Sequence, residues 1–146
     1  MEPTLREELD KYLNSYNFGD TPGGYEDRYF KFYIFRSFGI KLPNIIARRE
    51  AARIHDINHI LTRYKPIEWE GEVQIAFFEY GAGFGKYWFA RLIDAGALPL
   101  GIFWPRKSWQ AFFRGRKALS LYRNSELISL YLDKPVGDFR KKVNLA

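Results

Sequence analysis

Residues 43–79 decide the fold class of this chain: PNIIARREAARIHDINHILTRYKPIEWEGEVQIAFFE. Their apolar residues recur at helical spacing, and Pro43 suits the first turn of a helix that runs to about Arg63. Tyr64-Lys65-Pro66 predicts a turn. A second helix is expected from near Glu68 to at least Glu79, because acidic residues favour the positive end of a helix dipole. Two helices joined by a short turn indicate an all-α protein.

The flanking segments extend this helical pattern. Thr4 can cap a first helix with apolar residues from Leu5 to Tyr16, and residues 17–24 predict a loop. The aromatic stretch 25–37 is interpreted as a helix rather than a strand. Further helices are expected over residues 105–113, 125–132 and 136–143. We therefore expect residues 1–146 to form one compact all-α domain, with antiparallel helices around a metal site.

Composition narrows the class of protein. The 146 residues suit one domain, and 47% are hydrophobic, which excludes a disordered chain. There is no cysteine, so disulfides, thiolate nucleophiles and cysteine-ligated metals are excluded. No apolar run is long enough for a membrane span, and the acidic N-terminus is not a targeting sequence. The expected location is the cytoplasm, soluble or at a membrane surface.

The two histidines of the chain, His55 and His59, are four residues apart. Side chains at this spacing share a face of a helix, and Asp56 lies beside them. Two imidazoles and a carboxylate suit zinc or another divalent first-row metal.

The following helix offers a further ligand. Glu72 follows Gly71, which lets two backbones approach closely, and the turn before it would bring Glu72 to the histidine pair. Glu79 lies two turns further on the same face, and Thr62 lies one turn beyond His59. We expect Glu79 and Thr62 to lie next to the ligand side chains and to orient them without contacting the metal.

Other interpretations of the same residues can be compared. His-Asp phosphohydrolases and membrane desaturases need more histidines than this chain has. The zincin motif has glutamate where Asp56 stands, so a small metallohydrolase with Asp56 as its base stays an alternative. Histidines at this spacing can also be ordinary surface or core residues.

Several segments together resemble one known family. They are His55-Asp56-Ile57-Asn58-His59-Ile60-Leu61-Thr62, then Gly71-Glu72, then Arg114-Gly115-Arg116-Lys117-Ala118 and Asp133-Lys134-Pro135-Val136-Gly137-Asp138-Phe139-Arg140. This pattern is similar to the coenzyme Q biosynthesis protein 4 family.

The resemblance implies a helical protein, peripherally bound to a membrane, that binds a prenylated substrate and a divalent metal. It implies His55, Asp56, His59 and Glu72 as metal ligands, with Asp56 and Glu72 as candidate catalytic carboxylates. It also implies a place in ubiquinone biosynthesis, by oxidative decarboxylation of a prenylated aromatic precursor. A non-catalytic module that carries an isoprenoid lipid is a further alternative, and a homo-oligomer is left open.

The charge of +6 is concentrated at the end of the chain. Residues 101–146 hold 10 Lys/Arg against 3 Asp/Glu, whereas residues 1–100 hold 13 against 14. Aromatic and basic residues mix there as they do in membrane-surface segments, so we expect an anionic membrane as partner and no nucleic acid. The candidate contact residues are Trp104, Arg106, Lys107, Trp109, Phe112, Phe113 and Arg116.

A glycine-rich segment follows the second predicted helix. Residues 81–86 read Gly-Ala-Gly-Phe-Gly-Lys, but they lack the first glycine and the final Ser/Thr of a phosphate-binding loop. We interpret these glycines as sites of close helix contact or a bend.

Overall fold

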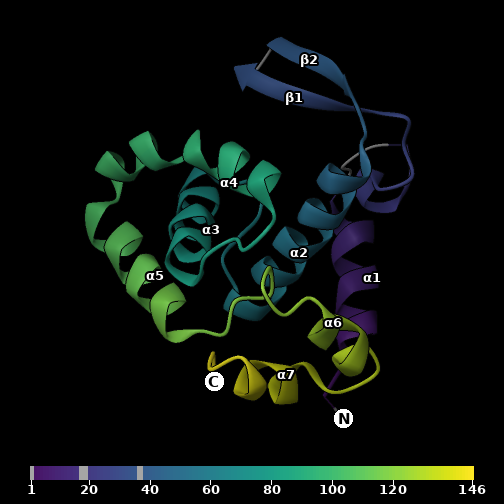
Figure 1. Cartoon of the computed structure of the whole chain (residues 1–146), viewed down its shortest axis with the longest axis vertical. Coiled ribbons are helices and arrows are strands. Elements are labelled where there is room, and N and C mark those ends of the chain that lie inside the picture. Colours follow the sequence, from purple (N-terminus) through teal and green to yellow (C-terminus); the bar gives the residue numbers. More distant parts are fainter. Residues whose placement is uncertain (1, 17–19, 36–37) are drawn as a thin grey trace.

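The computed structural model describes residues 2–16, 20–35 and 38–146, and within these ranges it is mostly helical. Figure 1 shows the helices gathered into one body with a small hairpin projecting from it. The elements in chain order are α1 (Leu5–Ser15), η1 (Pro22–Gly24), β1 (Tyr29–Phe35), β2 (Phe38–Pro43), α2 (Ile46–Thr62), α3 (Trp69–Ala82), α4 (Trp88–Ala95), η2 (Leu98–Phe103), α5 (Pro105–Lys117), α6 (Glu126–Tyr131) and α7 (Val136–Lys142). The all-α prediction is confirmed, with a two-stranded addition.

Helix α1 begins at the predicted cap. The Thr4 hydroxyl accepts from the Glu7 amide, and the Glu7 carboxylate accepts from the Thr4 amide, which is a complete capping box. The start of α1 also pairs with the chain before α7, since the Val136 amide donates to the Pro3 carbonyl at 3.1 Å. Both ends of the chain consequently lie on one side of the molecule (Figure 1).

The prediction of a helix over residues 25–37 is wrong. Residues Tyr29–Phe35 form β1, which pairs antiparallel with β2 in a register that sets Phe30 opposite Leu42. Aromatic and β-branched residues favour an extended backbone, and pairing with β2 stabilises that conformation in this segment. Residues 17–19 of the predicted loop and residues 36–37 lie outside the described ranges.

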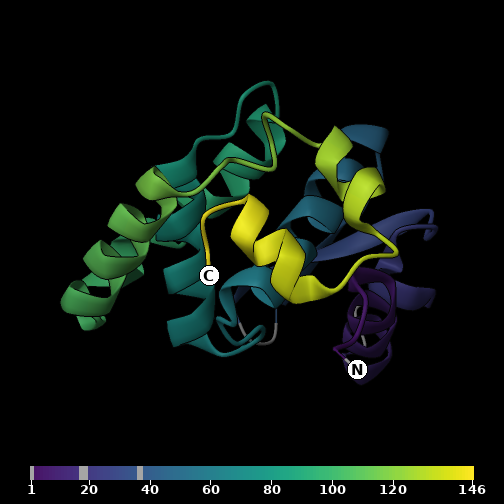
Figure 2. The same cartoon turned by 90° about the horizontal axis from the view of Figure 1, so that it is seen from below.

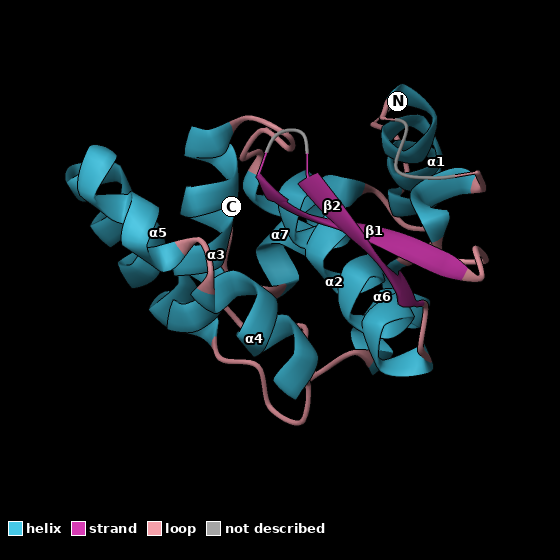
Figure 3. Cartoon of the chain, turned by 90° about the horizontal axis from the view of Figure 1, so that it is seen from above, coloured by secondary structure: helices cyan, strands magenta, loops and turns pink. Residues whose placement is uncertain are grey.

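Pro43 likewise ends β2 instead of starting a helix, and α2 begins three residues later at Ile46. The hairpin lies beyond the N-terminal end of α2, over the helical body, as the view from above shows (Figure 3). Its described contacts with the body include Phe30, whose ring meets Phe89 at 6.3 Å and lies under the Arg48 guanidinium at 4.7 Å.

Helices α3 and α5 pack at close range through two glycines. A methyl group at Gly81 would lie 2.1 Å from the Phe112 carbonyl oxygen, and one at Gly115 would lie 2.0 Å from the Phe78 carbonyl oxygen. No side chain fits at such distances, so glycine is required on both helices. The interpretation of Gly81 as a site of close helix contact is confirmed. Helix α3 ends at Ala82 and is capped by Gly83, which has a positive φ of 89°.

Helices α5, α6 and α7 match the expected positions to within a few residues, whereas α4 and η2 were not predicted. Seen from below, α6 and α7 lie across one face of the body (Figure 2). Here Arg140 of α7 donates to the carbonyls of Leu61 at 3.0 Å and Ile60 at 2.7 Å, at the C-terminal end of α2. Part of the C-terminal positive charge is therefore used inside the fold.

Within the described residues, every helix is too short or too polar to cross a bilayer.

Candidate metal centre

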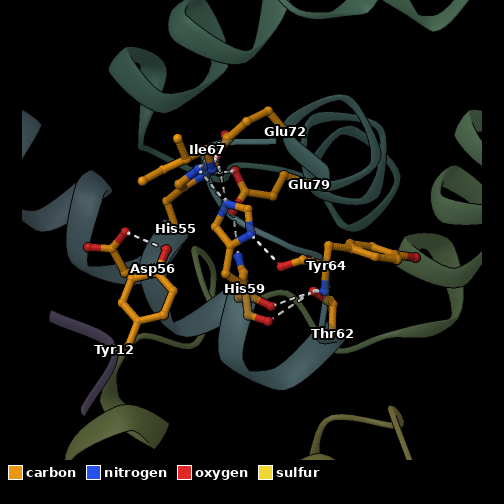
Figure 4. A network of polar contacts seen from close by, with 10 residues as sticks. Tyr12, His55, Asp56, His59, Thr62, Tyr64, Ile67, Glu72 and Glu79 are labelled. Atoms are coloured by element: carbon orange, nitrogen blue, oxygen red, sulfur yellow. Dashed lines mark hydrogen bonds and ion pairs between the residues drawn. The ribbon is translucent and has the colours of Figure 1, made fainter. Parts of the chain in front are cut away.

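The centre is built on the face of α2 that is turned toward α3. His55 and His59 lie one helical turn apart, and their Nε2 atoms approach to 3.2 Å (Figure 4). Their rings meet edge to face with centroids 4.8 Å apart. His59 is 2% exposed and stacks near the Tyr12 ring, whereas His55 is half-buried. The predicted pairing of the two imidazoles is confirmed.

Acceptors hold the outer nitrogen of each ring. His59 Nδ1 lies 2.9 Å from the Tyr64 carbonyl, and His55 Nδ1 lies 3.2 Å from Glu79 Oε2. A carbonyl and a carboxylate can only accept, so each Nδ1 carries a hydrogen and donates it. With Nδ1 as the donor in each ring, the two Nε2 atoms face each other and the Glu72 carboxylate, so a cation or a proton can lie between them.

Glu72 of α3 completes a three-residue group. Its two carboxylate oxygens lie 3.7 Å from His55 Nε2 and from His59 Nε2, one oxygen toward each ring. The Ile67 amide donates to Glu72 Oε1 at 2.7 Å and holds that carboxylate in place. Ligand atoms of these three side chains lie within 4.8 Å of one another. The predicted convergence of Glu72 with the histidines is confirmed, and ligation of a metal by the group stays a prediction.

The turn between α2 and α3 aims Glu72. Arg63 and Ile67 adopt left-handed backbone conformations, with φ of 64° and 68°. This is costly for a β-branched residue such as Ile67, and it presents the Ile67 amide to Glu72. A methyl group at Gly71 would lie 1.8 Å from the Lys65 carbonyl oxygen, so the predicted need for close backbone approach at Gly71 is confirmed.

Asp56 is not brought into this group. Consecutive residues of a helix are rotated by about 100°, so the residue after His55 faces away from α3. Tyr12 donates to the Asp56 carboxylate at 3.4 Å, and Tyr25 donates to its other oxygen. Burial is the main cause that raises the pKa of Asp56, and burial beside this carboxylate raises the pKa of both tyrosines, which therefore stay protonated donors.

If His55, His59 and Glu72 hold a metal ion, we expect Asp56→Asn to bind it as well as the unaltered chain does, because none of these three side chains changes. Metal content of the purified variant, measured by elemental analysis, should match the unaltered chain, and the affinity should stay within about threefold. Loss of the metal in Asp56→Asn would show instead that Asp56 turns toward the histidines when the ion binds.

The two supporting residues behave differently. Glu79 is fully buried and contacts His55 directly, as expected of a residue that orients a ligand. Thr62 acts through the turn that follows α2. Its hydroxyl donates to the Asn58 carbonyl at 2.7 Å and accepts from the Tyr64 amide at 3.3 Å. Thr62 thereby fixes the turn whose carbonyl holds His59.

Two residues of the centre, Tyr122 and Asp94, were not predicted from the sequence. Tyr122 donates to Glu79 Oε2 at 2.9 Å, and Asp94 of α4 is 5% exposed and lies close to Glu79 and His55. The sequence contains one indication of Asp94, which is the single acidic residue between Glu79 and Glu126. An isolated acid in an apolar, basic segment indicates a specific role.

The charges of the centre shift its titration. Burial alone would lower the pKa of His55, but Glu79 and Glu72 outweigh it and hold that pKa well above its ordinary value. Burial would raise the pKa of Glu72, but hydrogen bonding and charge from the two histidines lower it strongly. Glu72 is therefore a carboxylate throughout the physiological range, as a metal ligand must be.

A cleft of about 930 Å³ opens onto the centre. His55, Asp56, His59, Glu72 and Asp94 line its floor. Its walls are partly apolar and come from the hairpin and α4, including the side chains Phe30, Phe89, Ala90 and Ile93. The arrangement places two imidazoles and three carboxyl groups at the bottom of a space large enough for an organic ligand.

The predicted membrane-contact residues lie on or beside α5. Trp109 and Phe113 are more than half exposed, and Arg106 and Arg116 are also exposed. Trp104 and Phe112 are half-buried. Lys107 is exposed but paired with Glu70 at 2.5 Å.

Comparison of this chain with family models, curated proteins and solved structures finds no match in any of the three.

Proposed function

We propose that the protein binds one divalent metal ion, with zinc preferred, between His55, His59 and Glu72. The observation that carries this proposal is the facing pair of Nε2 atoms beside the Glu72 carboxylate, on two rings that are each held by an acceptor at Nδ1. Two neutral imidazoles and one carboxylate form a donor set that zinc accepts, with a fourth position left to solvent or substrate. When bound, the ion would act as a Lewis acid toward a group at the cleft floor.

We further propose that the cleft holds a prenylated aromatic precursor of quinone biosynthesis, as the resemblance of the histidine motif implies. The apolar wall at Phe89 and Ile93 suits an isoprenoid chain, and the polar floor suits a substituted ring. Tyr12 and Tyr25 hold the Asp56 carboxylate in place where it lines the cleft. Oxidative decarboxylation is the reaction that the resemblance implies.

Metal analysis combined with mass spectrometry of co-purifying lipid tests this proposal. We expect about one divalent ion per chain and an isoprenoid or prenylated aromatic compound in the extract. Folded protein with no divalent ion after exposure to zinc would contradict the metal site. Bound isoprenoid without turnover of any prenylated aromatic acid would favour the non-catalytic carrier instead.

Metal affinity should rise with pH. An ion needs His55 neutral, and the carboxylates hold the pKa of His55 above its ordinary value in the metal-free chain. We expect the apparent affinity to increase by about tenfold per pH unit up to that pKa and then to level off. Isothermal titration with zinc between pH 5.5 and pH 8.5 would measure this, and an affinity independent of pH would contradict it.

The raised pKa of His55 also affects the stability of the metal-free fold. A raised pKa in the folded state stabilises the metal-free fold below the unfolded pKa of about 6.5, and that contribution is lost as pH rises through the folded value. The increase in melting temperature caused by saturating zinc should therefore grow over this range.

We also propose that the surface formed by α4, η2 and α5 binds an anionic membrane. The supporting observation is a set of large apolar side chains between 55% and 75% exposed: Trp88, Leu92, Ile102, Phe103, Trp109 and Phe113. Residues 88–117 hold six Lys/Arg and one acid, Asp94, which is buried. Since α4 also lines the cleft, a lipid on this surface would be next to the entrance.

Vesicle binding tests the surface. We expect Trp109→Gln with Phe113→Gln to weaken binding to anionic vesicles by at least about tenfold, and Arg106→Gln with Arg116→Gln to weaken it by about fivefold per charge. Leu130→Gln is the control, because Leu130 is 60% exposed on α6, outside this surface. Equal binding to neutral and anionic vesicles would contradict the electrostatic part.

A further inference from the structure

A second set of ligand atoms lies behind the histidine pair, on the side of His55 that faces α4. The set comprises His55, Glu79 and Asp94, and their ligand atoms lie within 4.8 Å of one another. It uses the opposite edge of the His55 ring, because Nδ1 faces Glu79 while Nε2 faces Glu72 and His59. The two sets share one residue and are otherwise separate.

Asp94 lacks compensation for its burial. It is 5% exposed, and its Oδ2 atom has no hydrogen-bond partner among the described residues. Glu79, beside it, is completely buried. Two adjacent buried carboxylates repel each other, so a proton or a cation must lie between them. Burial and the neighbouring Glu79 raise the pKa of Asp94, and the two carboxyl groups share a hydrogen bond.

Glu79 is fixed in position before any ligand binds. Asn58 donates to its Oε1 at 2.7 Å, and Tyr122 donates to its Oε2 at 2.9 Å. Asp94 comes from α4 and His55 from α2, so three helices converge on this point. A site whose groups are already held in place has a smaller entropic cost of binding.

We propose that the protein binds a second divalent cation at this inner position, between His55 Nδ1, Glu79 and Asp94. This inference rests on the proposed function, in that the outer ion between His55, His59 and Glu72 is the first to bind. The protein is then a two-metal protein in which the His55 ring bridges the two ions.

The proton and charge balance supports a divalent ion. The second cation takes the place of the hydrogen on His55 Nδ1 and of the proton that Asp94 holds beside Glu79; both protons leave to solvent, and the ring becomes an imidazolate with one nitrogen for each ion. Glu72, Glu79, Asp94 and the imidazolate together carry four negative charges, which two divalent ions balance.

The donor sets predict an order of affinity. The outer set contributes two imidazole nitrogens and one carboxylate, and the outer ion binds while the His55 ring still carries its Nδ1 hydrogen. The inner ion must displace a ring proton, so its binding is weaker and depends more steeply on pH.

Counting bound ions tests the inference. The full chain, stripped with a chelator and dialysed, is titrated with zinc by calorimetry and then analysed for metal and protein. We expect two ions per chain for the unaltered protein and one for Asp94→Asn, which keeps the side-chain shape and removes the charge. The control is Asp138→Asn, an exposed acid on α7, which should retain two.

The outcomes separate the two proposals. No bound ion would overturn the proposed function together with this inference. One ion in both the unaltered chain and Asp94→Asn would overturn the inference and leave the outer site intact. Two ions in Asp94→Asn would place the second ion elsewhere and also overturn it.

A spectroscopic measurement covers the case in which Asp94→Asn fails to fold. Manganese(II) bound at both positions of the unaltered chain should give a spin-coupled electron paramagnetic resonance spectrum. The simple six-line spectrum of isolated manganese(II) at saturation would overturn the inference without any variant.

Discussion

His59→Ala should contain almost no divalent metal after purification and zinc exposure. The substitution removes one of two imidazoles in a three-residue group, and His59 is the ring held most firmly, by the Tyr64 carbonyl at 2.9 Å and by burial. Changes behind metal ligands already weaken binding by about 10–100-fold, so loss of a ligand should exceed about 100-fold. Elemental analysis and zinc calorimetry would measure the effect.

Glu72→Gln should show nearly the same loss, because the amide has no charge to offer the ion. Glu68→Gln is the matched control, since Glu68 is exposed and pairs with Lys65 at 3.3 Å. Circular dichroism should confirm that each variant is folded. Stoichiometric metal in folded His59→Ala would contradict the proposed centre.

Gly115→Ala should strongly destabilise the fold. The added methyl group would lie 2.0 Å from the Phe78 carbonyl oxygen and 3.0 Å from the Ala82 amide nitrogen, so it would meet backbone that cannot rotate away. Relief requires α5 to move away from α3, which would open the packing around Gly81 as well. We expect the free energy of unfolding to fall by more than about 3 kcal/mol, beyond the usual range for overpacking. Urea unfolding followed by circular dichroism would measure it.

Gly96→Ala is the control for that experiment. Gly96 has a negative φ, and a methyl group there would lie 3.3 Å from the Ile93 carbonyl oxygen, a contact that a small shift relieves. We expect a change within about 1 kcal/mol. A Gly115→Ala variant as stable as Gly96→Ala would show that the two helices are not in close contact.

The local patterns that were read correctly share a physical basis. Helix periodicity and capping act over a few residues, so the Thr4 cap and the start of α5 at Pro105 follow from adjacent residues. The i,i+4 spacing of His55 and His59 likewise places two rings together in any helix. Glu72 was found because a short turn leaves few ways to connect two helices.

The wrong expectations arose where distant contacts decide the outcome. The segment from Tyr29 to Phe35 suits either helix or strand by composition, and its pairing with residues 38–43 makes it a strand. Asp56 was assigned by its neighbours in sequence, but helical rotation turns it away from α3, and its partners Tyr12 and Tyr25 come from 44 and 31 residues away. Arg114 was counted with the basic segment, yet its guanidinium donates to the Thr62 carbonyl at 3.0 Å.

The sequence by itself determined a helical protein and a face of α2 that carries two imidazoles, because both follow from hydrogen bonding and spacing within one helix. The tertiary structure decided which carboxylates join them. Glu72 and Glu79 arrive from α3 and Asp94 from α4, while Asp56 turns away toward α1. A side chain's partners depend on how helices pack, and that packing depends on contacts between distant segments, such as Gly81 with Phe112 and Gly115 with Phe78.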